Sequence, residues 1–152
     1  MKTKKFSKIH TCSLLVVFLF IAIISCNKNP YNDNSRLLGT WENKQPNFTE
    51  TYIYDGINFD AGSYKMKVKS IIWSSDASGI IYGRYITNSF YTNVVGKYYA
   101  VSFKDLTDTS ILISGAYKEK GKIATDSLVE AITEFTINNG YYSFYSSCKK
   151  VK

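Results

Sequence analysis

The feature that most constrains the fold is an alternation of apolar and charged side chains in the middle of the chain. Residues 64–69 read Tyr-Lys-Met-Lys-Val-Lys, so Tyr64, Met66 and Val68 lie on one side of an extended segment and three lysines on the other. This pattern predicts a β-strand with one buried and one solvated face. The lysine side is either a basic binding patch or, as we expect, a solvated face that discourages pairing with other chains.

Most of the chain after residue 36 has a similar character, because Tyr, Ile, Val, Thr and Phe dominate segments separated by turn-forming residues. Strands are expected at residues 37–42, 48–54, 64–69, 80–87, 97–104, 110–117 and 141–147. Residues 125–135 instead have helical spacing, with one apolar stripe formed by Leu128, Val129, Ile132 and Phe135. Ser127 and Glu130 have the spacing of a capping box. The sequence therefore predicts an all-β fold, an antiparallel β-barrel or curved sheet, with one α-helix in its C-terminal region.

The N-terminal segment has the two parts of a secretory signal peptide. Residues 1–8 carry four lysines and no acid, and the eleven residues 14–24 are all apolar. A membrane-spanning helix needs about 20 apolar residues, so this stretch is too short to cross a bilayer. We therefore predict that residues 1–25 are a signal peptide.

The four residues Ile23-Ile24-Ser25-Cys26 resemble the lipobox of bacterial lipoproteins: two aliphatic residues, a small residue and a cysteine. The resemblance implies that the Cys26 sulfur receives a diacylglyceryl group and that cleavage before Cys26 frees an amine for a further acyl chain. Each buried methylene contributes roughly 0.8 kcal/mol, so two or three chains hold a protein in the membrane durably. An aspartate after this cysteine retains many lipoproteins in the inner membrane; Asn27 stands there, which favours the outer membrane of the cell envelope. The alternative is an ordinary signal peptide in which Cys26 is incidental.

Removal of the signal peptide changes what the composition implies. The four lysines of the head leave with it, so the formal net charge falls from +7 to +7 − 4 = +3. No basic cluster remains, and we therefore expect no nucleic-acid partner. Residues 27–35 are rich in turn formers and predict a flexible tether. We expect a signal peptide at 1–25, lipidated Cys26 with a tether at 26–36, and one β-domain at 37–152.

The mature chain offers little for catalysis or metal binding. His10 and Cys12 leave with the signal peptide, so no histidine remains and Cys148 is the one thiol besides Cys26. This excludes Ser-His-Asp and Cys-His catalysis, and it argues against a zinc site. Acidic pairs occur at Asp55 and Asp60 and at Asp105 and Asp108, in predicted turns where aspartate caps its own backbone. We therefore expect no enzyme, no metal and no cofactor.

Two places in the chain carry a resemblance to a known family. Gly39-Thr40-Trp41 resembles the Gly-x-Trp of the first lipocalin strand, where the tryptophan plugs one end of the barrel. Residues within 97–148, above all 99–107 and 113–118, look like small lipocalin-like lipoproteins that spirochaetes such as treponemes carry in many copies. The resemblance implies a lipocalin-like barrel or strongly curved sheet, with the late helix at its side or mouth. It also implies that an arginine, Arg84 rather than Arg36, stacks on Trp41.

The number of aromatic residues in the β-domain leaves two roles open. The first is a carrier that holds a small apolar ligand in an aromatic-lined barrel, with candidate lining residues Tyr64, Met66, Val68, Tyr98 and Tyr117. The second is a surface or periplasmic interaction protein, in which the barrel is a scaffold that contacts a host or envelope protein. An open cavity of several hundred Å³ favours the carrier, and a filled interior excludes it.

Closure of the barrel is a further prediction. The first and last strands of an up-and-down barrel must meet or nearly meet. We therefore expect residues 141–147 to lie beside the strand that holds Trp41. The apolar stripe of the helix should cover barrel surface rather than face water.

Overall fold

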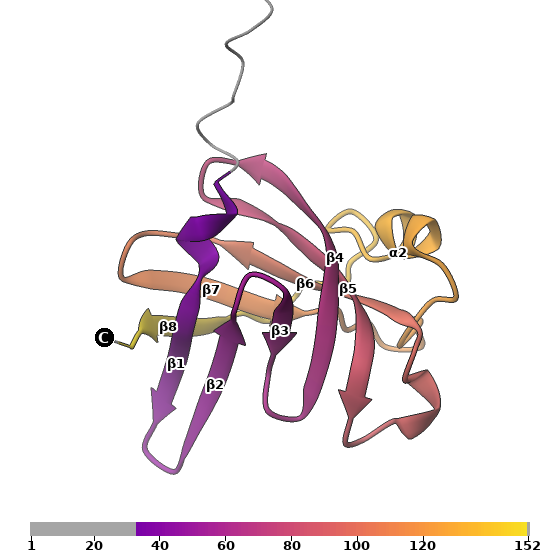
Figure 1. Ribbon diagram of the computed structural model, residues 1–152, viewed down its shortest axis with the longest axis horizontal. Coiled ribbons are helices and arrows are strands. Elements are labelled where there is room, and N and C mark those ends of the chain that lie inside the picture. Colours follow the sequence, from indigo (N-terminus) through magenta and orange to yellow (C-terminus); the bar gives the residue numbers. More distant parts are fainter. Residues whose placement is uncertain (1–32, 152) are drawn as a thin grey trace, which may run out of the picture. The chain divides into compact units, whose positions relative to one another are not determined.

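The computed structural model describes residues 33–151 of the chain (Figure 1). The predicted signal peptide, the predicted lipidation site at Cys26 and the first part of the predicted tether lie outside these residues. Within them, no helix is both long enough and apolar enough to span a bilayer.

Eight antiparallel strands form a closed barrel, in which each strand pairs with its neighbour in sequence and the last pairs with the first. The strands are β1 (Gly39–Gln45), β2 (Phe48–Tyr54), β3 (Asn58–Asp60), β4 (Tyr64–Ser75), β5 (Ser78–Asn88), β6 (Tyr98–Lys104), β7 (Ser110–Gly115) and β8 (Ser146–Lys150). Trp41 of β1 lies opposite Lys150 of β8. The all-β prediction is confirmed, and the choice between barrel and curved sheet is resolved in favour of a closed barrel.

Three strands, β3, β4 and β8, differ most from their predicted positions. β4 continues to Ser75 rather than ending at Lys69. β3 has three residues and was not predicted, because so short a segment shows no usable alternation. The closing strand is β8, which begins at Ser146 rather than at Tyr141. The prediction that residues 141–147 pair beside Trp41 is wrong, since Lys149 and Lys150 are the residues opposite β1. Tyr141 and Tyr142 are instead buried against the neighbouring helix, and the Tyr142 hydroxyl donates to the Phe135 carbonyl at 3.2 Å. These contacts hold the segment before β8 away from a strand conformation.

The end of the predicted tether is folded against the barrel. Asn34–Leu37 form a 3₁₀ helix, η1, at the start of the domain. The indole N–H of Trp73 donates to the Asn34 side chain at 2.9 Å, and the Arg36 guanidinium donates to the carbonyls of Asp76 and Leu106. The prediction of a flexible tether is therefore wrong for this end of the segment, because side-chain hydrogen bonds bind it to two turns of the barrel.

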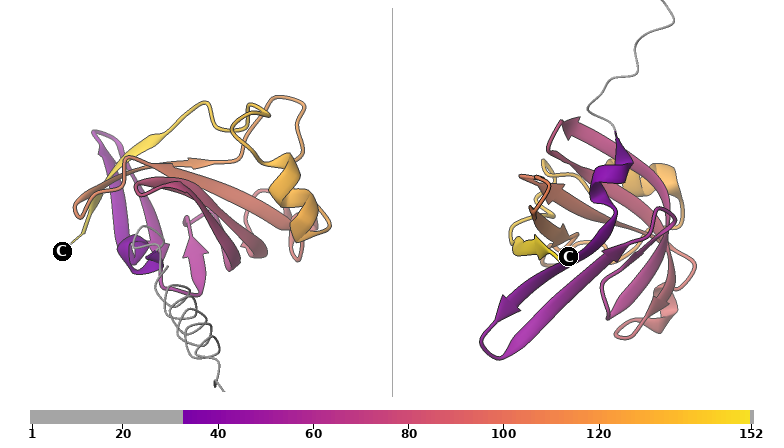
Figure 2. Two further views of the ribbon diagram at one scale, coloured as in Figure 1. Left: turned by 90° about the horizontal axis from the view of Figure 1, so that it is seen from above. Right: turned by 60° about the vertical axis from the view of Figure 1, so that its left-hand side comes forward.

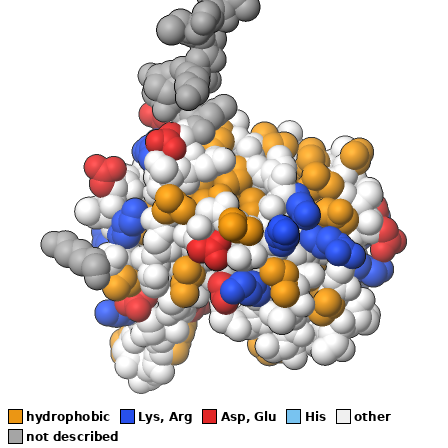
Figure 3. All heavy atoms as spheres, viewed as in Figure 1, with side chains coloured by type: hydrophobic (Ala, Val, Ile, Leu, Met, Phe, Trp, Pro, Cys, Tyr) orange, Lys and Arg blue, Asp and Glu red, His pale blue; other side chains and the backbone are white. Residues whose placement is uncertain are grey.

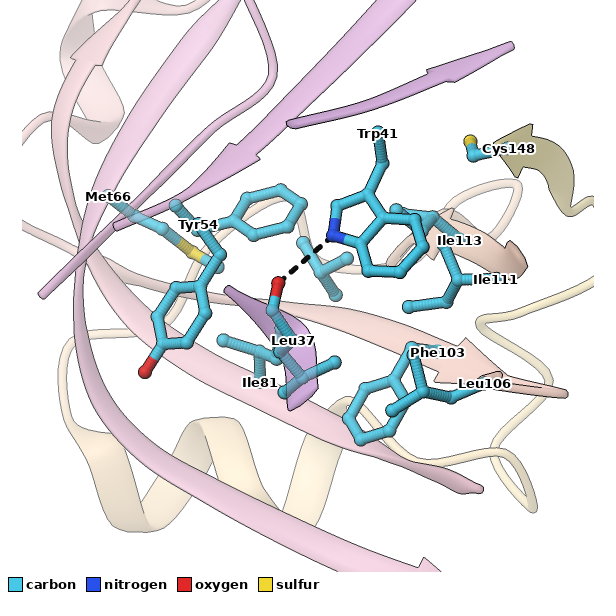
Figure 4. Close-up of a cluster of buried hydrophobic side chains, with 12 residues drawn as sticks. Leu37, Trp41, Tyr54, Met66, Ile81, Phe103, Leu106, Ile111, Ile113 and Cys148 are labelled. Carbon is cyan, nitrogen blue, oxygen red and sulfur yellow. Dashed lines mark hydrogen bonds between the residues drawn. The ribbon is translucent and has the colours of Figure 1, made fainter. Parts of the chain in front are cut away.

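The inner faces of the strands share one apolar core (Figure 4). Its buried members are Leu37, Trp41, Tyr54, Phe59, Met66, Ile81, Val101, Phe103, Leu106, Ile111, Ile113 and Cys148. The alternation predicted for β4 is confirmed: Met66 is fully buried, whereas Lys67 and Lys69 are exposed. A β-bulge after Val68 shifts the register of the later half of β4.

The predicted helix is present as α2 (Leu128–Glu134), which is shorter than expected and lies on the outer face of β5 and β6 (Figure 2). The Ser127 hydroxyl accepts a hydrogen bond from the Glu130 N–H at 3.1 Å and so caps the helix. Val129 is 74 % exposed, and the prediction that it covers the barrel is wrong. Ala131 faces the barrel instead. Val129 lies two positions before it, which is about 200° around the helix, and therefore points to the opposite side.

The β1–β2 hairpin projects beyond the rest of the barrel (Figures 1 and 2). β1 and β2 pair along their whole length, from Gly39 with Tyr54 to Gln45 with Phe48. β8 pairs with β1 only at Trp41 and Glu42, so the tip of the hairpin extends past its neighbours in the sheet.

Basic side chains gather on the outer face of β4 and β5 (Figure 3). Lys67 lies opposite Arg84 in the register of these two strands. Lys65 forms an ion pair with Asp60 at 3.6 Å. The lysine face of residues 64–69 therefore lies on the barrel exterior, as the alternation predicts.

Candidate functional site

Trp41 is buried in the apolar core, beside η1. Its side chain is 2 % exposed, and its indole N–H donates to the Leu37 carbonyl of η1 at 2.9 Å (Figure 4). The ammonium of Lys150 lies 5.0 Å from the centre of the indole ring, within cation–π range. The ring is thus fixed by η1 on one side and by the last strand on the other, which is the geometry of a structural plug.

Arg84 does not take the place over Trp41 that the resemblance implied. Ile81 and Tyr85 face the interior of β5, so Arg84, at the alternate position, faces outward and is exposed. Its guanidinium donates to the Gly96 carbonyl. The cation over the ring is Lys150, and sequence reasoning missed it because the pairing of the two chain ends is not visible in local pattern.

The interior behind Trp41 is filled by side chains. The void left there is about 10 Å³, and it is lined by Leu37, Trp41, Tyr54, Phe59, Ile81, Val101, Phe103, Ile111 and Ile113. A single water needs at least about 10–15 Å³, and drug-sized ligands occupy sites of about 300–1,000 Å³. Small eight-strand barrels can either fill with side chains or hold one ligand. This barrel is of the first kind.

The candidate lining residues do not form one site. Met66 is buried in the core and Val68 packs against it. Tyr98 lies on the outer face, packed in the cluster under α2. Tyr117 is 67 % exposed beyond the end of β7. Of the five, only Tyr64 lies at an open part of the barrel, at the end that carries the β1–β2 and β3–β4 turns.

A cluster of tyrosines occupies this open end. The ring of Tyr64 meets the rings of Tyr85 and Tyr99 edge-on, with centroids 5.7 and 5.4 Å away, and the latter two stack at 5.0 Å. The Tyr99 hydroxyl donates to the Ala116 carbonyl at 3.0 Å. Tyr64 lines the groove at this end and also packs against the apolar core, so it lies between the two.

The tyrosine hydroxyls are protonated at neutral pH. Burial raises the pKa of Tyr64, Tyr85 and Tyr99 well above the ordinary value of 10, and the neighbouring phenols raise it further. A protonated phenol can donate a hydrogen bond to a ligand. The Tyr64 hydroxyl is available to do so, since it has no hydrogen-bond partner among the described residues.

A groove of about 500 Å³ lies at this open end. It is lined by Thr49, Glu50, Thr51, Tyr52, Ala61, Gly62, Ser63, Tyr64 and Gly115. Glu50 is the one charged residue of this lining, and its carboxylate accepts a hydrogen bond from the Asn43 amide at 2.9 Å. The groove therefore combines a carboxylate, hydroxyls and aromatic surface, and sequence reasoning had singled out only Tyr64 of its members.

Two other hollows lie on the surface. One, of about 400 Å³, is lined by Glu42, Asn43, Lys44, Ser147, Lys149, Lys150 and Val151 beside the β1–β8 seam. The other, of about 90 Å³, includes Tyr117 and shares Tyr52 and Gly115 with the groove. The larger of these two is bounded by Lys44, Lys149 and Lys150 and has no aromatic residue in its lining, which makes it a weaker candidate than the groove.

Asp55 and Asp60 stabilise turns, whereas the Asp105 and Asp108 carboxylates accept no hydrogen bond among the described residues. One carboxylate oxygen of Asp55 accepts from the Ile57 N–H at 2.8 Å and from the Asn58 N–H at 2.5 Å, and hydrogen bonds from Asn58 and Ile57 lower its pKa to about 2. Asp60 accepts from the Gly62 N–H at 2.9 Å. The prediction that this pair caps backbone is confirmed. Within residues 33–151, no group of three or more His, Cys, Asp or Glu side chains is placed to hold a metal ion.

Cys148 belongs to the core. Its side chain is fully buried, and burial raises the pKa of the thiol to about 12. A nucleophilic cysteine needs a lowered pKa and access to solvent. The geometry of Cys148 is that of a packing residue.

No protein-family model, curated protein or solved structure matches this chain.

Proposed function

We propose that the chain is a lipid-anchored lipoprotein of the bacterial cell envelope whose barrel is an interaction scaffold rather than a carrier. The filled interior supports a scaffold rather than a carrier, because the void behind Trp41 is about 10 Å³. A carrier of apolar ligands needs a cavity of about 300 Å³ or more. The role that remains is contact with another molecule through the exterior or the open end.

The sequence supports the anchor. A basic head, a short apolar core and the lipobox-like segment that ends at Cys26 stand in the order of a lipoprotein signal. Asn27 after the cysteine favours the outer membrane. A closed up-and-down barrel with a late helix also agrees with the resemblance to small lipocalin-like spirochaetal lipoproteins. The proposed partners are the membrane, through the lipid at Cys26, and a host or envelope protein; no catalytic activity is proposed.

Detergent-phase partitioning tests the anchor. The full chain, expressed in a Gram-negative host, should enter the detergent phase, and mass spectrometry should find a mature N-terminus at Cys26 with attached acyl chains. Cys26→Ala should remain in the aqueous phase or keep its signal peptide. Cys12→Ala is the matched control, because it removes a cysteine of the signal peptide outside the lipobox and should be processed like wild type. Equal acylation of the Cys26→Ala chain would contradict the proposal.

A further inference from the structure

The barrel has an open strand edge at β2. β3 pairs with β2 only at Ile53 and Tyr54, whereas β2 continues to Phe48 as the second arm of the projecting hairpin. Residues 48–52 therefore have β1 on one side and, within the described part of the chain, no strand on the other. Closed barrels usually leave no such edge exposed.

The direction of the free backbone groups follows from strand alternation. Successive residues of an antiparallel strand direct their N–H and C=O groups to opposite neighbours. The Asp55 N–H donates to the Asn58 carbonyl at 3.2 Å across the β2–β3 turn. Ile53, Thr51 and Thr49 are the alternate residues that precede Asp55 along the strand. Their N–H and C=O groups therefore face the same side as those of Asp55. Ile53 is paired with β3 there, but the N–H and C=O groups of Thr51 and Thr49 face the groove with no strand partner among the described residues.

The groove lies directly along this edge. Residues 49–52 and residues 61–64 line it, together with Gly115 of β7. A Cβ atom at Gly115 would lie 3.6 Å from the Tyr64 hydroxyl, so this donor, which has no partner among residues 33–151, lies beside Gly115 in the groove. Glu50 brings a carboxylate with no ion pair among the described residues, and no lysine or arginine lines the groove. The site thus offers main-chain donors and acceptors together with uncompensated negative charge.

We propose that this groove binds an extended peptide segment of a partner protein, which adds a strand to the free edge of β2 and places a lysine or arginine against Glu50. Thr49 and Thr51 repeat at about 7 Å, twice the rise per strand residue, and a second strand presents complementary groups at the same repeat. Strand addition to an exposed edge is a general mode of peptide recognition, in which main-chain hydrogen bonds provide affinity and side-chain pockets provide specificity. The Tyr64 hydroxyl would meet an inward-facing group of the peptide.

This inference rests on the proposed role as an interaction protein, but not on the lipid anchor. Peptide binding without acylation at Cys26 would overturn the anchor alone. Acylation without peptide binding would overturn the groove proposal and leave the envelope assignment standing.

Hydrogen–deuterium exchange of the full chain in non-ionic detergent, with residue-level fragmentation, tests the proposal. The probe is the peptide acetyl-Val-Thr-Lys-Thr-Val-amide. In the free protein the amides of Thr49 and Thr51 should exchange fast, and those of Glu50 and Tyr52, which face β1, slowly. Saturating probe should slow Thr49 and Thr51 by about tenfold, as one or two net hydrogen bonds imply. The same peptide with N-methyl groups on alternate residues should give no protection.

Two pairs of variants and probes complete the test. Thr51→Pro removes the N–H that faces the groove and should abolish protection, whereas Thr51→Val keeps that N–H and should bind like wild type. If the proline variant does not fold, Glu50→Gln serves instead: it should weaken the lysine peptide and leave its norleucine analogue unchanged. Equal protection by the N-methylated peptide, protection confined to other strands, or none at all would overturn the proposal.

Discussion

At the scale of single residues, Trp41 is the most constrained side chain of the barrel. It is held by the Leu37 carbonyl, by the Lys150 ammonium and by the apolar core. Lys67, by contrast, is exposed on the outer face of β4. The two residues therefore differ in burial and in the number of contacts that a substitution to alanine would remove.

Trp41→Ala should destabilise the domain by about 3–5 kcal/mol, because truncation of a large buried aromatic removes apolar contacts and leaves a cavity. That is a large part of the roughly 5–15 kcal/mol that stabilises a typical domain. Lys67→Ala, the control, should change the free energy of unfolding by less than about 0.5 kcal/mol. Urea titration followed by circular dichroism measures both values. Similar, small losses for the two variants would show that Trp41 is not a plug.

Cys148 predicts how stability depends on alkaline pH. Burial raises the pKa of its thiol to about 12 from an ordinary value of 9.0. Between these values the unfolded chain releases the thiol proton and the folded chain keeps it, so stability falls as pH rises, by up to about 1.4 kcal/mol per pH unit. The buried phenols of Tyr64, Tyr85 and Tyr99 add losses of the same sign above pH 10.

Urea midpoints measured from pH 8 to pH 11 test this dependence. Wild type should begin to lose stability near pH 9, whereas Cys148→Ala, which is less stable at neutral pH, should stay level until the tyrosines titrate. Parallel curves for the two proteins would contradict the assigned pKa of the thiol.

At the scale of elements, the sequence pattern predicted those strands, turns and helix ends that depend on interactions between residues near in sequence. Alternation and turn residues predicted β2 with its observed bounds and the β6–β7 hairpin, and the Ser127 cap predicted where α2 begins. What was missed depends on contacts between distant segments: the place of β8, the outward face of Val129 and the cation over Trp41. The groove was missed for the same reason, since it exists only because β3 stops pairing at Ile53.

The helix offers a test at this scale. Ser127→Ala should destabilise the domain by about 1 kcal/mol, because it removes the acceptor of the Glu130 N–H at the helix N-terminus. Val129→Ala is the matched control within the same helix; its side chain is 74 % exposed, and alanine has the higher helix propensity, so no loss is expected. Thermal unfolding of the two variants measures the difference. A loss at Val129 as large as that at Ser127 would show that the helix packs with a different face.

At the scale of the whole molecule, the barrel divides into a sealed part and an open part. η1, Trp41 and the turns around Asp76 and Leu106 seal one end. Side chains fill the middle, and Tyr64 lies between this core and the groove. We therefore expect any ligand to bind at the rim or on the exterior rather than beside Trp41.

Trp41 can report on this division directly, because its ring lies among the residues that fill the interior. The second tryptophan, Trp73, packs on Phe103 at 4.8 Å, so Trp73→Phe leaves Trp41 as the one indole of the domain while keeping an aromatic ring at that contact. Titration of this variant with dodecanoic acid, below its critical micelle concentration, should leave the Trp41 emission unchanged. The void of about 10 Å³ cannot admit an acyl chain without unpacking the core, and forcing extra methylenes into a well-packed core costs about 1–3 kcal/mol or more.

Phe103→Ala in the same background supplies the positive control, since it enlarges the void that Phe103 and Trp41 both line into a cavity that an apolar molecule can enter. Saturable quenching or a spectral shift in the parent variant, at a stoichiometry of one, would show that the barrel opens to ligands and would restore the carrier role.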